Sequence, residues 1–176
     1  MKTWKQFLLE KQHDYSSTQV NLPTDIAQKI MKWSHQFIAE EDVYTEDDHG
    51  RETEPHVTVL FGLHDNDAHS LKNALKGEKK VTMELKETSI FESAQYDVVK
   101  FTVESEDLYR LNRKISDACE NTQSHPSYSP HCTISYVKKG TGKKYIGNKE
   151  FDGTKLIIDH ILFSDKNRDK TKIALT

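Results

Sequence analysis

Apolar side chains recur at helical spacing in two long stretches of the chain and alternate with polar ones in several shorter stretches. Around Ile30, Trp33 and Phe37 the apolar positions fall three or four residues apart, which places them on one side of a helix. The same spacing returns over residues 105–119, and the polar, acid-rich residues 40–54 are typical of a surface loop. The predicted helices are residues 3–11, 24–38, 66–75 and 105–119, and the two long ones start at the capping residues Thr24 and Ser105.

Stretches in which β-branched or apolar residues alternate with polar ones predict the strands. Each long helix precedes a strand, with a polar loop between them, and this order recurs in the two halves of the chain. The recurrence predicts one α+β domain over residues 1–176, with two similar lobes at about 16–75 and 80–176 and an exchange of strands between them. The predicted strands are residues 16–22, 56–63, 80–87, 97–104, 131–137, 155–163 and 171–175, with Ile90 and Phe91 in a further strand.

One short sequence occurs nearly twice. Residues 55–60 read Pro-His-Val-Thr-Val-Leu, and residues 130–135 read Pro-His-Cys-Thr-Ile-Ser. Because a strand turns residues i and i+2 to the same face, each copy presents one imidazole and one hydroxyl on one side. Two such strands facing each other would offer all these side chains to one small anion. These motif residues are His56, Thr58, His131 and Thr133.

The motif residues suit acid–base chemistry at a phosphodiester without a metal or an organic cofactor. Histidine titrates near neutral pH, so one imidazole can deprotonate a water or a ribose 2′-hydroxyl while the other protonates the departing oxygen. The threonine hydroxyls would donate hydrogen bonds to the non-bridging oxygens, where charge must be held in the transition state. The symmetric motif leaves open which histidine is the base. The remaining histidines are scattered, and no compact set of zinc ligands is visible.

Composition limits the partners of such a site. The formal net charge is only −3, so no basic excess favours long-range capture of duplex DNA or RNA, whereas a small phosphate ligand needs only a local positive site. No stretch approaches the roughly 20 apolar residues that span a bilayer. Cys119 and Cys132 have neither metal-ligand nor disulfide spacing, and reduced thiols indicate a cytoplasmic protein.

Aromatic and basic residues near the motifs are candidates for substrate contacts. Tyr15 precedes the first strand and Tyr136 follows the second motif, and either ring would stack on a nucleobase or pack at the rim of the site. On a regular strand Tyr136 points away from the motif residues, so only a β-bulge would bring it to their side. Lys138 and Lys139 begin a basic, glycine-bearing stretch to residue 149, which serves either as a lid over a phosphate or as a solvated loop.

The paired His-x-Thr motifs and the order of elements resemble the 2H phosphoesterase superfamily, which is named for two motifs of this kind. The resemblance covers about residues 16–176. It implies a bilobal α+β fold, with antiparallel sheets and outer helices, in which the motif residues line a central cleft. It also implies that His56 and His131 are catalytic and that Thr58 and Thr133 bind phosphate. The superfamily includes RNA 2′,3′-cyclic phosphodiesterases and related nucleotide hydrolases.

Three segments are similar to a compact phage-encoded group within this superfamily: residues 17–23, 96–100 and 131–140. The group includes the anti-CBASS phosphodiesterases, which degrade the cyclic oligonucleotide messengers of bacterial antiphage defence. The resemblance implies that a cyclic di- or trinucleotide is cleaved at 3′-5′ linkages in the host cytoplasm, with the adjacent 2′-hydroxyl as nucleophile. Two alternatives remain open: an RNA-end 2′,3′-cyclic phosphodiesterase, and a module that binds nucleotides without turnover.

Overall fold

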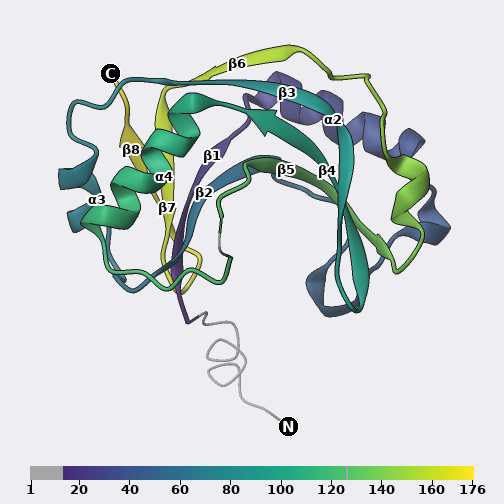
Figure 1. Cartoon of the computed structure of the whole chain (residues 1–176), viewed down its shortest axis with the longest axis horizontal. Helices are drawn as coiled ribbons and strands as arrows, with labels where there is room; N and C mark the ends of the chain where they lie inside the picture. The colour runs from purple at the N-terminus through teal and green to yellow at the C-terminus, as the bar shows by residue number, and fades with distance from the viewer. Residues whose placement is uncertain (1–13, 126) are drawn as a thin grey trace, which may run out of the picture.

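The computed structural model describes residues 14–125 and 127–176, and it confirms the predicted α+β class. The eight strands of these residues form one antiparallel sheet in the order β6-β3-β4-β5-β2-β1-β7-β8. In Figure 1 the sheet bends into an arch, and the α-helices lie along its outer side. The strands are β1 (Ser16–Asn21), β2 (His56–Leu63), β3 (Val81–Glu92), β4 (Tyr96–Glu104), β5 (His131–Lys138), β6 (Thr154–Ile158), β7 (His160–Ser164) and β8 (Lys170–Ala174). The helices are α2 (Thr24–Phe37), α3 (His69–Ala74) and α4 (Glu106–Ala118), with short 3-10 helices η1 (Glu40–Asp42), η2 (Glu46–Asp48) and η3 (Gly142–Tyr145). The helix predicted at residues 3–11 lies outside the described residues.

The motif strands β2 and β5 lie side by side in the middle of the sheet. The prediction of one strand over residues 155–163 is wrong, because this stretch divides at Asp159. Its first part, β6, pairs with β3, and its second part, β7, pairs with β1 in the other half of the sheet. The apolar run over these residues correctly predicts β-structure. Its periodicity does not show at which residue the chain leaves one neighbouring strand and pairs with another. A smaller error concerns Ile90 and Phe91, which extend β3 instead of forming a separate strand.

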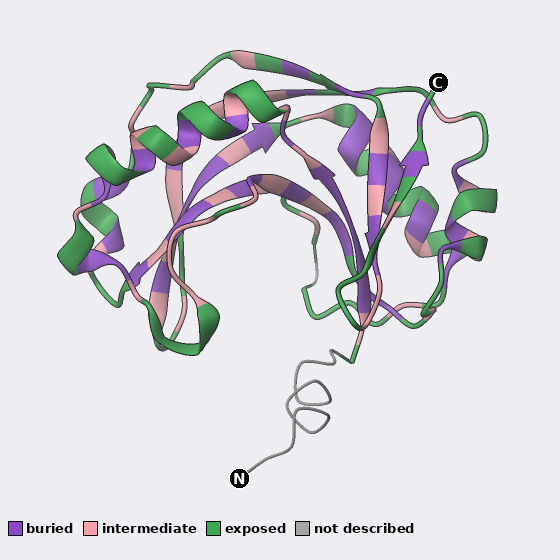
Figure 2. Cartoon of the chain, turned by 180° about the vertical axis from the view of Figure 1, so that it is seen from behind, coloured by how far each residue is buried: buried purple, intermediate pink, exposed green. Residues whose placement is uncertain are grey.

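The apolar core lies between the helices and the outer side of the sheet. Trp33 of α2 stacks on Phe101 of β4 with ring centroids 5.8 Å apart, and the buried residues of α4 include Leu111 and Ile115. Figure 2 shows the buried faces of both helices turned toward the strands. Since successive strand residues alternate between faces, residues that alternate with the core positions point to the concave side. No helix of the described residues covers that side in either view.

The start of α2 and the two cysteines can also be compared with the predictions. Pro23 occupies the N-cap position of α2 and Thr24 is the first helical residue, so the prediction of a Thr24 cap is wrong. Both cysteines, Cys119 and Cys132, are buried free thiols. Nowhere in residues 14–125 and 127–176 is a helix both long and apolar enough to cross a membrane.

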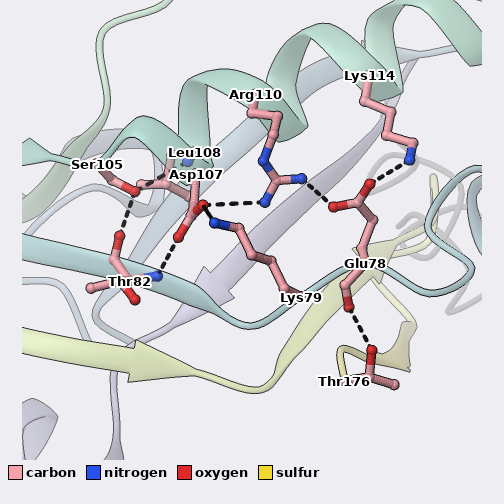
Figure 3. Close-up of polar contacts among 9 residues, drawn as sticks. All are labelled: Glu78, Lys79, Thr82, Ser105, Asp107, Leu108, Arg110, Lys114 and Thr176. Atoms are coloured by element: carbon pink, nitrogen blue, oxygen red, sulfur yellow. Dashed lines mark hydrogen bonds and ion pairs between the residues drawn. The ribbon is translucent and has the colours of Figure 1, made fainter.

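Side-chain hydrogen bonds hold the start of α4 against β3 (Figure 3). Ser105 caps the helix as predicted: its Oγ accepts from the Leu108 amide at 3.1 Å and donates to the Thr82 carbonyl at 2.7 Å. The Asp107 carboxylate accepts from the Thr82 amide at 2.9 Å. Since β4 runs directly into α4, these contacts connect the helix to the half of the sheet that contains β5.

Glu78 connects α4 to the C-terminus of the chain. Its carboxylate accepts hydrogen bonds from Arg110 and Lys114, and its carbonyl accepts from the Thr176 hydroxyl at 3.2 Å (Figure 3). The same carbonyl also accepts from the Thr176 amide at 2.8 Å. The hydrogen bond from Lys114 lowers the pKa of Glu78 most, burial opposes this effect, and the bond from Arg110 lowers the pKa further. The ionised form of Glu78 is therefore favoured in the folded state.

We expect Glu78→Gln to lower the free energy of unfolding at pH 7 by about 1 kcal/mol, a modest value because water screens the partly exposed Arg110 and Lys114. A depressed pKa in the folded state stabilises the fold above the unfolded-state value of about 4.3 and ceases to do so as the pH falls through the folded-state value. Urea denaturation at pH 7 and at pH 3 measures both effects. The difference from wild type should be smaller at the lower pH. A loss no larger than that of the exposed control Glu150→Gln at pH 7 would refute this role.

Candidate active site

The register of the central strands brings the motif residues together. Val57 of β2 lies opposite Cys132 of antiparallel β5, and both are fully buried in the core. The residues on either side of this pair are the four motif residues, which therefore share the opposite face of the sheet, here called the motif face. On it His56 lies beside Thr133, and Thr58 lies beside His131, so the two imidazoles occupy one diagonal. Diagonal neighbours on a sheet lie about 7–8 Å apart, a spacing that leaves room for one phosphate between the rings.

Both histidine rings are oriented in the same way. The Nδ1 atom of His56 lies 2.7 Å from the Glu54 carbonyl oxygen, and that of His131 lies 2.8 Å from the Ser129 carbonyl oxygen. A carbonyl oxygen only accepts, so each Nδ1 must carry the proton, and in the neutral ring Nε2 keeps its lone pair. In each copy the carbonyl belongs to the residue before the motif proline, a residue that proline holds in an extended conformation. Each ring can therefore accept a proton at Nε2 or, once protonated, donate one.

A β-bulge in each motif strand brings an aromatic ring to the motif face. The pairing of β5 with β4 skips Ile134, and the pairing of β2 with β1 skips Val59. The extra residue reverses the alternation beyond it. Tyr136 and Phe61, five positions after the respective histidines, consequently join the motif face. The expectation that Tyr136 points away from the motif residues is therefore wrong. The β-bulge that sequence analysis named as the one exception is present.

Aromatic groups continue from these two rings in opposite directions. Beside β2, Tyr15 lies edge-to-face against Phe61 with centroids 6.0 Å apart, and stacks on His64 at 5.8 Å. Beside β5, Tyr136 lies 4.5 Å from the His49 ring and 5.2 Å from the Tyr96 ring. Sequence analysis found Tyr15 and Tyr136 but missed their partners. The signal for Phe61 was an aromatic residue at the same position after both histidines.

Burial and a nearby lysine act on the His131 imidazole. Burial lowers its pKa first, the hydrogen bond to the Ser129 carbonyl opposes this effect, and the positive charges of Lys100, His56 and His125 lower it further. Neutral His131 is therefore favoured at the pH where an ordinary histidine is half protonated.

The surroundings of His56 contain a carboxylate instead. Glu54 accepts a hydrogen bond from Asn21 at 2.6 Å and another from Lys170. Burial raises the pKa of Glu54, but the hydrogen bonds from Lys170 and Asn21 and the positive charge of His56 lower it overall. An ionised Glu54 near His56 and a cationic Lys100 near His131 make the two imidazoles electrostatically unequal.

Lys100 is a further residue of the candidate site that sequence analysis missed. In the register of the sheet Lys100 lies beside Thr133, whereas the equivalent position beside Thr58 is held by Gln19. The signal was a lysine inside a strand whose neighbours, Val99 and Phe101, are apolar. An isolated lysine of this kind gives no indication of which face it occupies until the register is known.

The basic stretch after β5 makes contacts within the protein. Lys138 Nζ donates to the Glu41 carbonyl at 2.6 Å, and Lys139 Nζ lies 3.4 Å from the buried Asp97 carboxylate. Lys144 forms an ion pair with Asp42 at 2.5 Å. These contacts favour the solvated-loop interpretation over a lid that closes on a phosphate. In the described part of the chain, no three His, Cys, Asp or Glu side chains are grouped so that they would hold a metal ion.

Comparisons with known proteins agree with this geometry. The model of the family described as the 2′-5′ RNA ligase superfamily matches residues 22–149. Among solved structures, the chain is similar to E. coli LigT in complex with 3′-AMP, at a TM-score of 0.63 and 14% identity, covering 94% of this chain and 99% of that one. It is also similar to Kluyveromyces marxianus Usb1 with uridine monophosphate, at 0.58 and 8%, covering 92% and 98%. For TT0787 of Thermus thermophilus the values are 0.57 and 16%, covering 92% and 97%. No curated protein matches the chain.

Proposed function

Because the chain belongs to the 2′-5′ RNA ligase superfamily and is thus a phosphodiesterase, we propose that it cleaves 3′-5′ linkages of cyclic di- or trinucleotides without a metal. One observation supports this proposal most: the two His-x-Thr strands pair with Val57 opposite Cys132, and this register puts both imidazoles on one face of the sheet. Their matching Nδ1 hydrogen bonds leave two Nε2 atoms for proton transfer.

In the proposed reaction His131 is the base and His56 is the acid. His131 Nε2 takes the proton of the 2′-hydroxyl, the 2′-oxygen forms a bond to phosphorus, and the bond from phosphorus to the 5′-oxygen breaks. His56 Nε2 gives its proton to that oxygen, so the products are a 2′,3′-cyclic phosphate end and a 5′-hydroxyl. The lowered pKa of His131 and the Glu54 carboxylate near His56 support this division.

The threonines would hold the charge that develops on the phosphate. Thr58 and Thr133 are half-buried on the motif face, each beside the histidine of the opposite strand. Tyr128 donates to the Thr58 carbonyl at 2.8 Å, which holds the backbone of β2 and leaves the side chain available. Hydroxyl donors at this place would stabilise the non-bridging oxygens of the transition state.

The aromatic groups on both sides of the motif residues favour an internal 3′-5′ linkage over an RNA end. A linkage between two nucleosides has a base on each side of the phosphorus, whereas a 2′,3′-cyclic phosphate end has one. Tyr15 with Phe61 and Tyr136 with Tyr96 would supply one stacking surface for each base. A phage-encoded enzyme with this specificity would remove the messengers of CBASS defence in the host cytoplasm.

The alternative is an RNA-end 2′,3′-cyclic phosphodiesterase. It is favoured by the similarity to LigT and Usb1, whose structures hold 3′-AMP and uridine monophosphate. Incubation with cyclic dinucleotides, cyclic trinucleotides and 2′,3′-cyclic NMP in EDTA separates these interpretations. Turnover of the cyclic oligonucleotides supports the proposal, preferential opening of cyclic NMP supports the RNA-end alternative, and binding without turnover would leave only a nucleotide-binding module.

We expect Tyr15→Ala and Tyr136→Ala each to raise KM for a cyclic dinucleotide about tenfold, because stacking contributes about 1–3 kcal/mol per base. Steady-state kinetics of the two variants measure the effect. The matched controls Tyr15→Phe and Tyr136→Phe keep the ring and should keep KM. Equal losses in the alanine and phenylalanine variants would argue for the hydroxyl groups and against stacking.

A further inference from the structure

Among the described residues, the buried ammonium group of Lys100 has no counterion. The residue is 5% exposed. Its Nζ donates to the Ser89 hydroxyl at 2.7 Å and lies 4.2 Å from the centroid of the Phe91 ring. Across residues 14–125 and 127–176 no carboxylate lies within ion-pair distance of it, and burial alone lowers its pKa. A neutral hydroxyl and an aromatic ring therefore make up its immediate polar surroundings.

Such an arrangement is unusual for a lysine. Buried charges in proteins are normally paired or bound to a ligand of opposite charge, because desolvation of an isolated ammonium costs several kcal/mol. Even lysines of this chain that are more exposed have carboxylate partners: Lys86 pairs with Glu84 and Glu104, and Lys139 pairs with Asp97. The absence of a counterion for Lys100 among the described residues thus points to a bound anion.

The ammonium lies next to the motif residues. Lys100 is the cross-strand neighbour of Thr133, and the Phe91 ring beneath its Nζ also lies edge-on to the His131 ring, with centroids 4.7 Å apart. Ser89, its hydrogen-bond partner, is 3.1 Å from the Thr102 hydroxyl, and Thr102 is the cross-strand neighbour of His131. One cation and two hydroxyl groups therefore adjoin the same end of the motif face.

The other half of the site lacks this feature. Gln19 occupies the equivalent position beside Thr58, and its amide donates to Asn21 at 2.6 Å. An uncharged amide that is already hydrogen-bonded to a neighbouring side chain does not need an anion as a partner. The difference shows that the ammonium is not required by the fold of a motif half.

We propose that Lys100 is a substrate-binding residue whose ammonium contacts a non-bridging oxygen of the phosphate held between the imidazoles, on the Thr133 side. The inference rests on the proposed function, since it adds a residue to the same site. The substrate phosphate supplies the negative charge that the described residues do not place beside Lys100, and only one of the two motif halves provides this contact. The bound nucleotide consequently has one preferred orientation in an otherwise nearly symmetric site.

Lys100→Met tests this assignment, because methionine retains most of the volume and removes the charge. Loss of one charge-stabilising donor should lower kcat/KM by about 10²–10³, and inorganic phosphate, used as a probe, should inhibit or bind roughly tenfold more weakly. The melting temperature should stay the same or rise, because an apolar replacement for a buried charge is often stabilising. The control Lys32→Met removes the same charge from the exposed side of α2 and should change none of these values. Lys100→Gln serves as a second variant if the methionine variant does not fold.

The NMR titration of His131 tests whether the Lys100 charge acts on the motif residues. Removal of the nearby positive charge should shift the His131 titration to higher pH, in the absence of any substrate. The readout that a purely structural role would not move is phosphate affinity: phosphate binding and kcat/KM that both match wild type in a folded Lys100→Met variant would overturn the inference. If wild type binds phosphate through Lys100 but cleaves none of the nucleotides, the proposed substrate is wrong and the anion contact still stands.

Discussion

His56→Ala and His131→Ala should each lower kcat by about 10²–10⁴ on a cyclic dinucleotide, because each removes one proton transfer. Both side chains are half-buried on the motif face. Among the described residues each ring makes one hydrogen bond, to the carbonyl two residues before it. The core residues Val57 and Cys132 on the other face are unaffected, so both variants should fold.

The matched control is His69→Ala, on the exposed surface of α3. It removes the same group and should retain wild-type kcat. Circular dichroism and thermal melting of all the variants establish that they are folded. Wild-type activity in either motif variant, with the fold intact, would exclude that histidine from the chemistry.

A bridging 5′-sulfur in the substrate should restore most of the activity of His56→Ala. A thiolate is a far weaker base than an alkoxide, so it departs without an added proton, and the loss of a general acid then has little consequence. We expect the rate loss of His56→Ala relative to wild type to be smaller on the sulfur substrate than on the oxygen substrate by a factor of about 10² or more. The upper limit of this factor is the full contribution of one proton transfer. Single-turnover rates on the oxygen and sulfur substrates measure it.

His131→Ala should stay slow on both substrates, since removal of the 2′-hydroxyl proton is still needed. The two variants thus serve as controls for each other. If the sulfur substrate restored His131→Ala and not His56→Ala, then His131 would be the acid and His56 the base. The lowered pKa of His131 would then not indicate which histidine is the base.

The sequence contained enough to locate the motif strands and to predict that their histidines share a face. A period of two residues fixes which side chains point together, and both copies have it. The long helices were equally visible, since α2 and α4 each present apolar residues at intervals of three and four. These features depend on local periodicity, which a single chain displays directly.

Features that depend on pairing between strands could not be predicted. The bulges at Ile134 and Val59 exist only relative to β4 and β1, and they decide where Tyr136 and Phe61 point. The division at Asp159 likewise depends on which strand each part meets. Long-range pairing leaves no periodic signal in one sequence, so the register had to come from the structure.

The same dependence explains why Lys100 escaped notice. Its local sequence predicts a strand but not its position beside Thr133 on the motif face. Nor does it show that, among the described residues, Ser89 is the only hydrogen-bond partner of its ammonium group. The two motif copies alone suggest a symmetric site. Lys100 on one side and Glu54 on the other give its two imidazoles different surroundings, which a directional reaction requires.

A crystal structure with a non-hydrolysable cyclic dinucleotide tests the central claim most directly. We expect one phosphorus atom to lie between the two histidines, with Nε2 of His56 and Nε2 of His131 each within hydrogen-bonding reach of oxygens bonded to it. A phosphate bound elsewhere, or contacted by one imidazole while the other stays too far away to exchange a proton, would contradict the claim.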